Sequence, residues 1–586
     1  MTRCLIALTL LTLTTTASAQ PAEDLASSAR QVFKKHCSAC HVGAGSENGF
    51  QFDALDRESM VKKFSDDEQP VLVPKSLESR VYVRAAVEKT MPPRSVKDRP
   101  TAVELETLKK WIEAGAPAAD LVRKVAFQSN YTQLKAIHDH LADADPDLRP
   151  YLRYFTLTNL HNNPAITAED LRITRAALSK AINSLSRKPR LALPKAIDKD
   201  ETILVIDLRD LDWDKDNLWH AVLTHYPYGL TYKDSEDDKL AKVQKDLDRL
   251  TRKQLVYLRA DWFVATATRA PLYYQLLHLP QTTHELRKWL EVDRDRNFRD
   301  NKLWRAGFQA SGVSGQNRLV ERHDSPVGNY YWESYDFKRR SARASLVRFP
   351  LGPLFPDNPY PRQAFVHDGG EMIFGLPNGL QGYFLTDGKG KRIDVGPIEV
   401  VSDGLKTSGT SAIVNGTSCM HCHKSGIIPV ADTIREGHAL FGNARDKVLK
   451  LYPERKTMDE LVKGDEKRFV DALDKTIGPF LKIGAARAKK VTEFTEPIGE
   501  VTRRYLAVRN SDDVGVQIAA SELGIEKSET LAGMIQGNST LKELGVLPLA
   551  KGKTIKRDDW EAVDVTASLF QDIALALRLG TPLRFR

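Results

Sequence analysis

One five-residue pattern occurs twice in the chain, as CSACH at residues 37–41 and as CMHCH at residues 419–423. Each copy has two cysteines three positions apart, and a histidine directly follows the second cysteine. This C-x-x-C-H spacing is the attachment signature of a c-type haem, because the two thiols can form thioethers with the two vinyl groups of one ring edge. The histidine would ligate the iron from the proximal side. The repeat therefore predicts two covalently bound haem c groups.

The two motifs predict a role in haem binding for six side chains. The predicted covalent anchors are Cys37, Cys40, Cys419 and Cys422, and the predicted proximal iron ligands are His41 and His423. A C-x-x-C pair can also be a redox disulfide or half of a zinc site, and the two pairs together could form one Cys4 zinc site. Neither alternative requires a histidine after the second cysteine, so both motifs favour haem. His421 fills an x position of the second motif, and we interpret it as a spacer.

The N-terminus has the pattern of a secretory leader. Arg3 precedes an apolar run at residues 4–13, and small residues at 17–19 form a cleavage site that ends at Ala19. The apolar run is too short to span a bilayer, and no later stretch has the pattern of a membrane span. The fifth cysteine, Cys4, lies in this leader. We therefore expect an exported, periplasmic chain with no integral membrane segment after cleavage, which agrees with haem attachment after export.

Composition and charge narrow the class of partner. The chain has 586 residues, of which 41% are hydrophobic and 28% charged, and these fractions are typical of soluble globular proteins with several domains. The formal net charge is +9, so a basic surface could dock an acidic redox partner. Lysine and arginine are spread along the chain without a long basic block or a nucleic-acid-binding motif. We therefore expect no nucleic-acid partner.

The first motif is followed by a candidate for the second axial ligand. Apolar spacing predicts a helix over residues 24–36 that leads into the motif, and a second helix over 77–89. The second helix leads to Met91, which two prolines follow. A thioether opposite a histidine gives a six-coordinate haem with a raised potential, and the prolines would stiffen the loop that presents the sulfur. Met91 is therefore predicted to be the distal ligand of haem 1, against the alternative that it fills the core.

The same region ends in a well-marked helix. Thr101 and Glu104 form a capping box after Pro100, and Gly115 and Pro117 mark the end. With CSACH, TMPPRS and LKKWIEAGAP, residues 29–117 resemble a cytochrome c domain of the planctomycete type. The resemblance implies an all-helical class I cytochrome fold at residues 20–118, with His41 and Met91 as axial ligands.

The rest of the chain predicts a larger α+β part, so the expected fold class is mainly α with a smaller β-rich part. Residues 119–300 should be mixed and mainly helical, with helices at 167–186, 237–252 and 283–290 and a strand at 201–208. An acidic run at 210–216 lacks the glycine and closing glutamate of an EF-hand and is interpreted as a solvated turn. The aromatic residues near this run are expected in the core: Trp213, Trp219, Tyr226 and Tyr228.

Residues 301–430 are predicted to hold the β-rich block that carries the second motif. Alternating apolar residues and glycines over 360–401 predict a small meander with a hairpin turn at 387–390. Residues 431–586 should be mainly helical, with breaks at 478–479 and 547–548. The stretches RAGFQASGVSGQNRLVERH, HDGGEMIFGLPNGLQGYFL and NGTSCMHCHKSG resemble larger bacterial dihaem c-type cytochromes, which join the planctomycete-type domain to a second C-x-x-C-H. This resemblance implies no established reaction.

The sequence does not identify the distal ligand of haem 2. His438 lies 15 residues after His423 on a predicted helix at 432–441, and His367 precedes a glycine pair that would allow a close approach to the haem. For each of them, a structural role is the competing interpretation. The iron could also be five-coordinate. The weaker candidates are Met372, Met458, Met534 and His323.

Three functional hypotheses follow. In the first, both irons are six-coordinate and the protein carries out electron transfer between periplasmic partners. In the second, haem 2 is the active centre of a peroxidase or oxygenase, haem 1 is its electron port, and His367 or His438 supplies acid–base chemistry. In the third, the chain is a haem-based sensor or binding module. No set of residues in the sequence identifies a substrate, and electron transfer is the favoured hypothesis.

Overall fold

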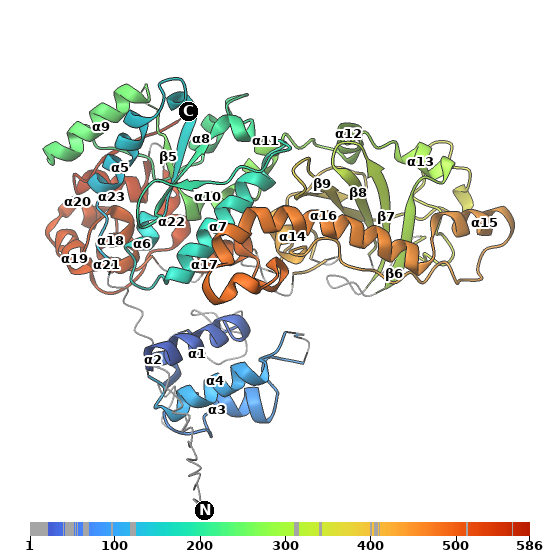
Figure 1. Ribbon diagram of the computed structural model, residues 1–586, viewed down its shortest axis with the longest axis horizontal. Coiled ribbons are helices and arrows are strands. Elements are labelled where there is room, and N and C mark those ends of the chain that lie inside the picture. Colours follow the sequence, from blue (N-terminus) through green and yellow to red (C-terminus); the bar gives the residue numbers. More distant parts are fainter. Residues whose placement is uncertain are drawn as a thin grey trace, which may run out of the picture. The chain divides into compact units, whose positions relative to one another are not determined.

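The computed structural model describes residues 22–38, 40–41, 52, 54–55, 57–61, 70–94, 96, 98–117, 125–252, 254–309, 316–338, 343–398, 401–403, 408, 411–510, 514–564 and 567–585. The predicted leader and the loop at 42–50 lie outside these residues. The chain divides into two compact units, Met1–Arg123 and Lys124–Arg586 (Figure 1). Its described part is a mixed α/β structure with several sheets. Among the described residues, no helix combines the length and apolar character needed to cross a lipid bilayer.

The N-terminal unit is helical in its described part. Its elements are α1 (Ala22–His36), α2 (Arg57–Val61), α3 (Arg80–Tyr82), a π-helical turn (Val83–Val87) and α4 (Ala102–Glu113). α1 packs against α4, where Phe33 meets Trp111 edge to face with 5.5 Å between ring centroids. The predicted capping box is confirmed, because the Thr101 side chain accepts from Glu104 N–H and the Glu104 carboxylate accepts from Thr101 N–H. The helix predicted over 77–89 is present over residues 80–87, as α3 and the π-helical turn that follows it.

One part of the second unit is built around a four-stranded sheet of order β2-β3-β1-β5. The strands are β1 (Leu152–Thr156), β2 (Lys195–Ala196), β3 (Ile203–Asp207) and β5 (Tyr257–Arg259). The surrounding helices are α5 (Asn130–Asp143), α6 (Thr158–His161), α7 (Ala168–Ser184), α8 (Leu218–Thr224), α9 (Asp238–Leu250), α10 (Ala260–Ala267) and α11 (Leu272–Leu277). The predicted strand at 201–208 and helices at 167–186 and 237–252 are thus confirmed. The four aromatic residues assigned to the core are buried.

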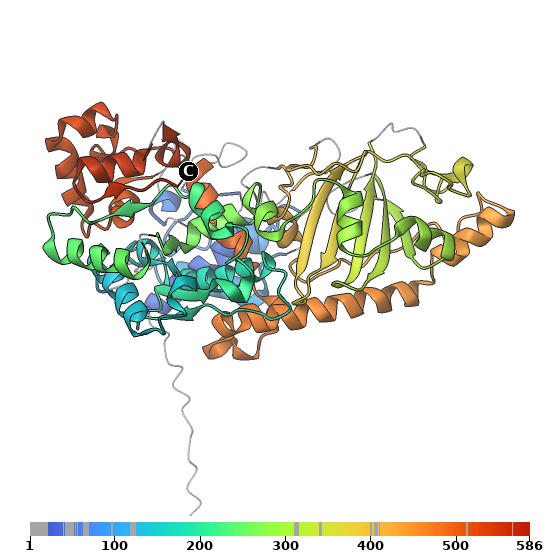
Figure 2. The ribbon, with the colours of Figure 1, turned by 90° about the horizontal axis from the view of Figure 1, so that it is seen from above.

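The other part of this unit is a five-stranded antiparallel sheet of order β10-β9-β8-β7-β6. The strands are β6 (Trp304–Gln309), β7 (Asn317–Ser325), β8 (Asn329–Asp336), β9 (Gly369–Gly375) and β10 (Gln381–Asp387). α12 (Thr283–Trp289) and α13 (Arg294–Asp300) contact one face of the sheet, through Arg287 to Glu333 and Arg294 to Glu321. The long α16 (Arg455–Leu481) runs along the other face, where Asp465 binds Arg322 and Trp332 (Figure 2).

The predicted meander has the expected turn. β9 and β10 pair antiparallel, and the Asp387 N–H donates to the carbonyl of Lys391 to close the turn after β10. The sheet is larger than predicted, because β6, β7 and β8 extend it from residues before the meander. The strand signal there was weak, since buried charged residues such as Arg305 and Glu321 interrupt the apolar alternation.

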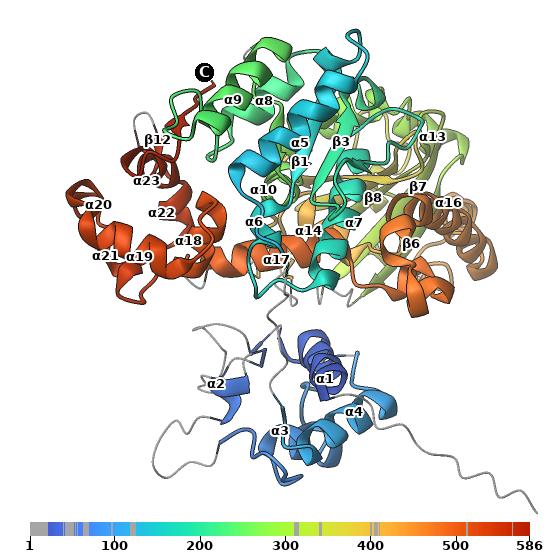
Figure 3. The ribbon, with the colours of Figure 1, turned by 60° about the vertical axis from the view of Figure 1, so that its left-hand side comes forward.

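Helices form most of the described C-terminal part. They are α15 (Gly442–Leu451), α16, α17 (Pro497–Asn510), α18 (Val516–Leu523), α19 (Ser528–Gly537), α20 (Ser539–Glu543), α21 (Leu547–Ala550), α22 (Arg557–Glu561) and α23 (Leu569–Ala576). α17 and α16 both pack on α7, and α18 to α23 cluster beside the four-stranded sheet (Figure 3). Short paired strands lie among them: β11 (Val563–Asp564) with β12 (Ala567–Ser568), and β13 (Thr581–Pro582) with β4 (Leu230–Thr231).

Two predictions about this region are wrong. The break predicted at 478–479 is absent, because α16 continues through Pro479 to Leu481. The helix predicted over 432–441 does not form. Asp432 instead accepts hydrogen bonds from the backbone N–H groups of Gly307, Ile434 and Arg435, and these bonds hold the segment as a turn against β6.

Candidate haem-attachment sites

The first motif directly follows the C-terminal end of α1. The Cys37 and Ser38 N–H groups both bond to the Phe33 carbonyl, which ends the helix, and the His41 N–H bonds to the Cys37 carbonyl. Cys37 is half-buried and Cys40 is exposed. The imidazole of His41 stacks on Phe52 with ring centroids 4.6 Å apart. Its buried Nδ1 has no hydrogen-bond partner within the described part of the chain.

Met91 lies on a loop whose backbone is fixed at several points. The N–H groups of Thr90 and Met91 both donate to the Arg84 carbonyl, at 2.9 and 3.1 Å. The Arg99 guanidinium donates to the carbonyls of Pro92 at 2.5 Å, Pro93 at 3.2 Å and Lys89 at 2.8 Å. One side chain therefore ties together both ends of the loop that carries the predicted thioether ligand.

The second motif begins in a short helix, α14 (Thr417–Cys422), and ends at its C-cap, His423. Gly416 precedes the helix with a φ of 91°, and a side chain there would overlap the Thr268 carbonyl and press against the Tyr273 ring. Cys419 is buried and Cys422 is half-buried. α14 packs against α17 and against β10, so the second motif lies where the helices of the C-terminal part meet the five-stranded sheet.

His423 has one ring nitrogen engaged and the other available. Its Nδ1 lies 3.1 Å from the Gly426 carbonyl oxygen, which can only accept, so Nδ1 carries the proton and donates. This bond fixes the tautomer and leaves Nε2 without a proton, as in histidines that bind a metal through Nε2. The Tyr383 ring on β10 stacks on the imidazole at 6.1 Å between centroids. The residues of the second motif thus fit a haem iron bound through Nε2.

A carboxylate faces the available nitrogen. Oε2 of Glu371, on β9, lies 3.7 Å from Nε2 of His423, and the two side chains are 15% and 12% exposed. Burial alone would raise the pKa of Glu371, but the charge of the nearby His423 imidazole, the charge of Arg318 and the Cys419 thiol hold that pKa down to about 2. Glu371 is therefore an anion at neutral pH.

Polar contacts hold the backbone of Glu371 in place. Its N–H donates to the Ser334 hydroxyl at 2.9 Å, and that hydroxyl lies 3.4 Å from the carboxylate of Asp336. Arg318 donates to the other oxygen of Asp336 at 2.6 Å. These bonds join β7, β8 and β9 and fix the strand from which the Glu371 side chain projects.

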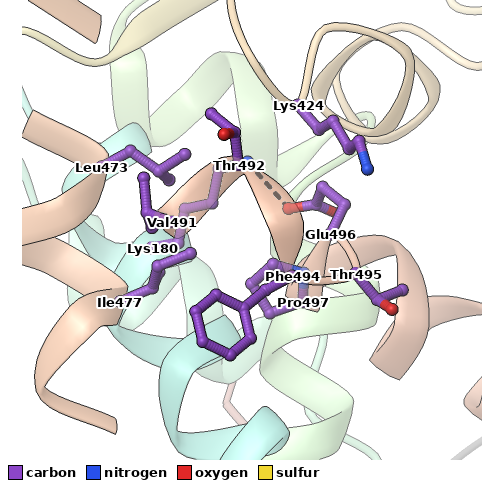
Figure 4. Close-up of a pocket in the computed structure, with 10 residues that line it drawn as sticks. All are labelled: Lys180, Lys424, Leu473, Ile477, Val491, Thr492, Phe494, Thr495, Glu496 and Pro497. Carbon is purple, nitrogen blue, oxygen red and sulfur yellow. Dashed lines mark hydrogen bonds and ion pairs between the residues drawn. The ribbon is translucent and has the colours of Figure 1, made fainter. Parts of the chain in front are cut away.

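His421, the spacer of the motif, faces a different environment. Its ring is packed against Gly499 of α17, so tightly that a methyl group there would overlap it. Close by, Lys180 of α7 and Glu496 form an ion pair at 2.7 Å, with 2% and 1% of their side chains exposed. A small pocket lies beside this pair and reaches Lys424, the residue after the motif (Figure 4). α17 therefore packs directly against the second motif, and the Lys180–Glu496 ion pair lies close to that contact.

Burial raises the pKa of three motif thiols, those of Cys37, Cys419 and Cys422. Burial, followed by the charge of Cys40, raises the pKa of Cys37 to about 12. Burial, followed by the charges of Asp403 and Glu371, raises the pKa of Cys422 to about 12. Burial also raises the pKa of Cys419 well above its usual value. A redox-active C-x-x-C pair instead has a lowered pKa, so these surroundings do not resemble those of a disulfide oxidoreductase.

The structure places His367 on the other face of the sheet from His423. The His367 ring meets Tyr335 edge to face at 5.0 Å, and Tyr335 lies with its hydroxyl 3.4 Å from Glu321. Glu321 is paired with Glu333 across the sheet, and Glu333 with Met372. Glu371 precedes Met372 in the strand, and adjacent side chains in a strand point to opposite faces. The sheet therefore separates His367 from His423.

His438 and the weaker candidates also lie elsewhere. His438 is exposed in the turn that follows Ile434, beside β6, whereas His423 stacks on β10 at the opposite edge of the sheet. His323 is buried and lies 2.8 Å from Glu321. Met372 shares the face of Glu333, Met458 is buried in α16, and Met534 is 41% exposed on α19. The structure brings none of these residues to His423.

The sequence analysis missed Glu371 and Tyr383. Both lie in the segment that it assigned to strands, HDGGEMIFG and LQGYFL. Only the register of β9 and β10 puts both side chains on one face of the sheet, and their contacts with His423 show that this face meets the motif. Comparison of the chain with protein-family models, with curated proteins and with solved structures gives no match.

Proposed function

We propose that the chain is an exported dihaem c-type cytochrome that transfers electrons in the periplasm. The observation that carries this proposal is the second motif, in which Nδ1 of His423 donates to the Gly426 carbonyl and leaves Nε2 for iron, while two thiols lie three positions apart in the same turn. The first motif supports it with the same residue spacing and with a candidate thioether ligand. The resemblance of residues 29–117 to a planctomycete-type cytochrome c domain points the same way.

Each motif would hold one covalent haem, which supplies one-electron redox chemistry when bound. Cys37 and Cys40 would anchor the first group, and His41 and Met91 would be its axial ligands. Cys419 and Cys422 would anchor the second, with His423 as its proximal ligand. The chain contributes ligand identity, burial and a fixed orientation of each imidazole, the factors that set a haem potential. The net charge of +9 suits an acidic redox partner.

A dihaem enzyme of the peroxidase or oxygenase type is the second candidate. The contact between Glu371 and His423 favours it, because a carboxylate near the metal-binding nitrogen could hold or move a proton at Oε2. In that case haem 1 would serve as the electron port. The predicted acid–base roles of His367 and His438 are not retained, since both lie away from His423.

The spin state of the purified ferric protein, followed by carbon monoxide addition to the reduced form, separates the two candidates. Two low-spin centres without carbon monoxide binding, together with rapid one-electron exchange with a small redox protein, support electron transfer. A high-spin centre that binds carbon monoxide and turns over peroxide would support the enzyme instead. A protein purified without haem after expression with a c-type maturation system would contradict both.

A further inference from the structure

The distance between His423 and Glu371 carries a further inference. Oε2 of Glu371 lies 3.7 Å from Nε2 of His423, which is too long for a hydrogen bond. The distance is close to the sum of two metal–ligand bonds of about 2 Å each to a histidine nitrogen and a carboxylate oxygen. The two atoms are thus spaced as two ligands on opposite sides of one metal ion would be.

The surroundings of Glu371 support a role at the metal and not only in the fold. Its backbone is held by the Ser334 hydroxyl, whereas Arg318 donates its strong bond to Asp336. The Glu371 side chain projects from the face of the sheet that meets α14, and its closest basic contact is the His423 imidazole. In the proposed site Nε2 of His423 would ligate the iron, and the carboxylate of Glu371 would then face that iron.

We propose that Glu371 is the distal group of haem 2, with its carboxylate facing the iron on the side opposite His423. This inference rests on the proposed haem at Cys419, Cys422 and His423. The sequence did not identify the distal group of haem 2. Glu371 replaces His367 and His438 as the candidate for that position. An anionic carboxylate near the iron stabilises the ferric state over the ferrous state, because the ferric centre carries one more positive charge.

The test uses the full-length haem-loaded protein and two variants, Glu371→Gln and Glu371→Ala. We expect both to keep two covalent haems and the wild-type spectrum and potential of haem 1. The ferric absorption and EPR signals of haem 2 should change, and its midpoint potential should rise. In Glu371→Ala, added formate should shift the haem 2 spectrum back toward that of the wild type, because it restores a carboxylate.

The matched control is Glu333→Gln, which removes a buried carboxylate from the opposite face of the same sheet and should leave haem 2 unchanged. If Glu371→Gln fails to fold, Glu371→Asp withdraws the carboxylate by one methylene and should still change the haem 2 spectrum. Unchanged spectra and potentials of haem 2 in variants that keep two haems would overturn the inference. A wild-type protein without haem at residues 419–423 would instead overturn the proposed function, and intact mass distinguishes the two results.

Discussion

The two C-x-x-C-H motifs share a spacing but are built into different surroundings. The first follows a helix in a small unit, with an exposed Cys40 and with its candidate second ligand, Met91, 50 residues further along the chain. The second lies in a short helix between a five-stranded sheet and α17, with a buried Cys419. Its neighbours come from α7, β9, β10 and α17. The comparison teaches that the spacing of a motif defines residues that are close along the chain, whereas the residues that surround the motif depend on how distant elements pack.

The largest expected effect is the loss of one haem when both cysteines of one motif are replaced. We expect Cys37→Ala with Cys40→Ala, and Cys419→Ala with Cys422→Ala, each to reduce the haem content from two to one. The second pair should also lower the thermal stability of the Lys124–Arg586 unit, because Cys419 lies in its core. Haem quantification and calorimetry test this prediction. Loss of both haems from either double variant would show that the sites are not independent.

The next largest effect concerns Met91, the predicted distal ligand of haem 1. Met91→Leu should remove the thioether band of ferric haem 1 and lower its potential by a sizeable part of the ~0.8 V range that axial ligands cover. Haem 2 should not change. The matched control is Met60→Leu, which makes the same replacement at a buried position in the core of the N-terminal unit. An unchanged haem 1 potential in Met91→Leu would remove Met91 as a ligand.

A third effect tests the packing behind the second motif. Gly499→Ala should destabilise the Lys124–Arg586 unit by about 1–3 kcal/mol, because the new methyl group overlaps the His421 ring. Gly464→Ala is the control, since Gly464 is exposed in α16 and has open space around it. That change should stabilise by about 0.5–1 kcal/mol. Denaturant unfolding measures both, and equal effects would show that α17 does not brace the motif.

The smallest effect is pH-dependent and confined to the first unit. Burial would raise the pKa of Glu104, but the Thr101 N–H, Lys35 and the Thr101 hydroxyl bring it down to about 2. A lowered pKa stabilises the fold above the unfolded value of 4.5, and this contribution is lost as the pH falls toward 2. Glu104→Gln should therefore cost about 1 kcal/mol at neutral pH and almost nothing near pH 2.

Hydrogen exchange of the α4 amides measures the stability of this helix in the full chain. Glu106→Gln is the control, because that carboxylate is 51% exposed and 3.9 Å from its partner Lys110. A cost of Glu104→Gln that is the same at pH 7 and pH 3 would contradict the role given to the carboxylate.

The sequence predicted those features that depend on neighbours along the chain. The capping box at Thr101 and Glu104, the helix capped by Thr167, the strand at Ile203 and the turn after Asp387 all follow from local patterns, and all are present. The predicted break at 478–479 failed because α16 packs against α7 near this point, where the Ser179 hydroxyl donates to the Thr476 carbonyl. Long-range packing thus outweighed a local signal.

The candidate site also contains some residues that the sequence could predict and others that it could not. The motif residues could be read from spacing alone, but the sequence pointed to His367 and His438 for the distal side of haem 2. Nothing local distinguishes the face of a strand that meets a distant helix from the face that meets α12 and α13. Glu371 could be found only after the register of β9 with β8 and β10 was known.

The intact mass of the mature protein under denaturing conditions tests the central claim most directly. The measurement is made after expression with a c-type haem maturation system, followed by mapping of the haem-bearing peptides. Two covalent haems, one on the peptide with Cys37 and Cys40 and one on the peptide with Cys419 and Cys422, are the predicted result. The mass of the bare polypeptide, or a disulfide within either pair, would contradict the account.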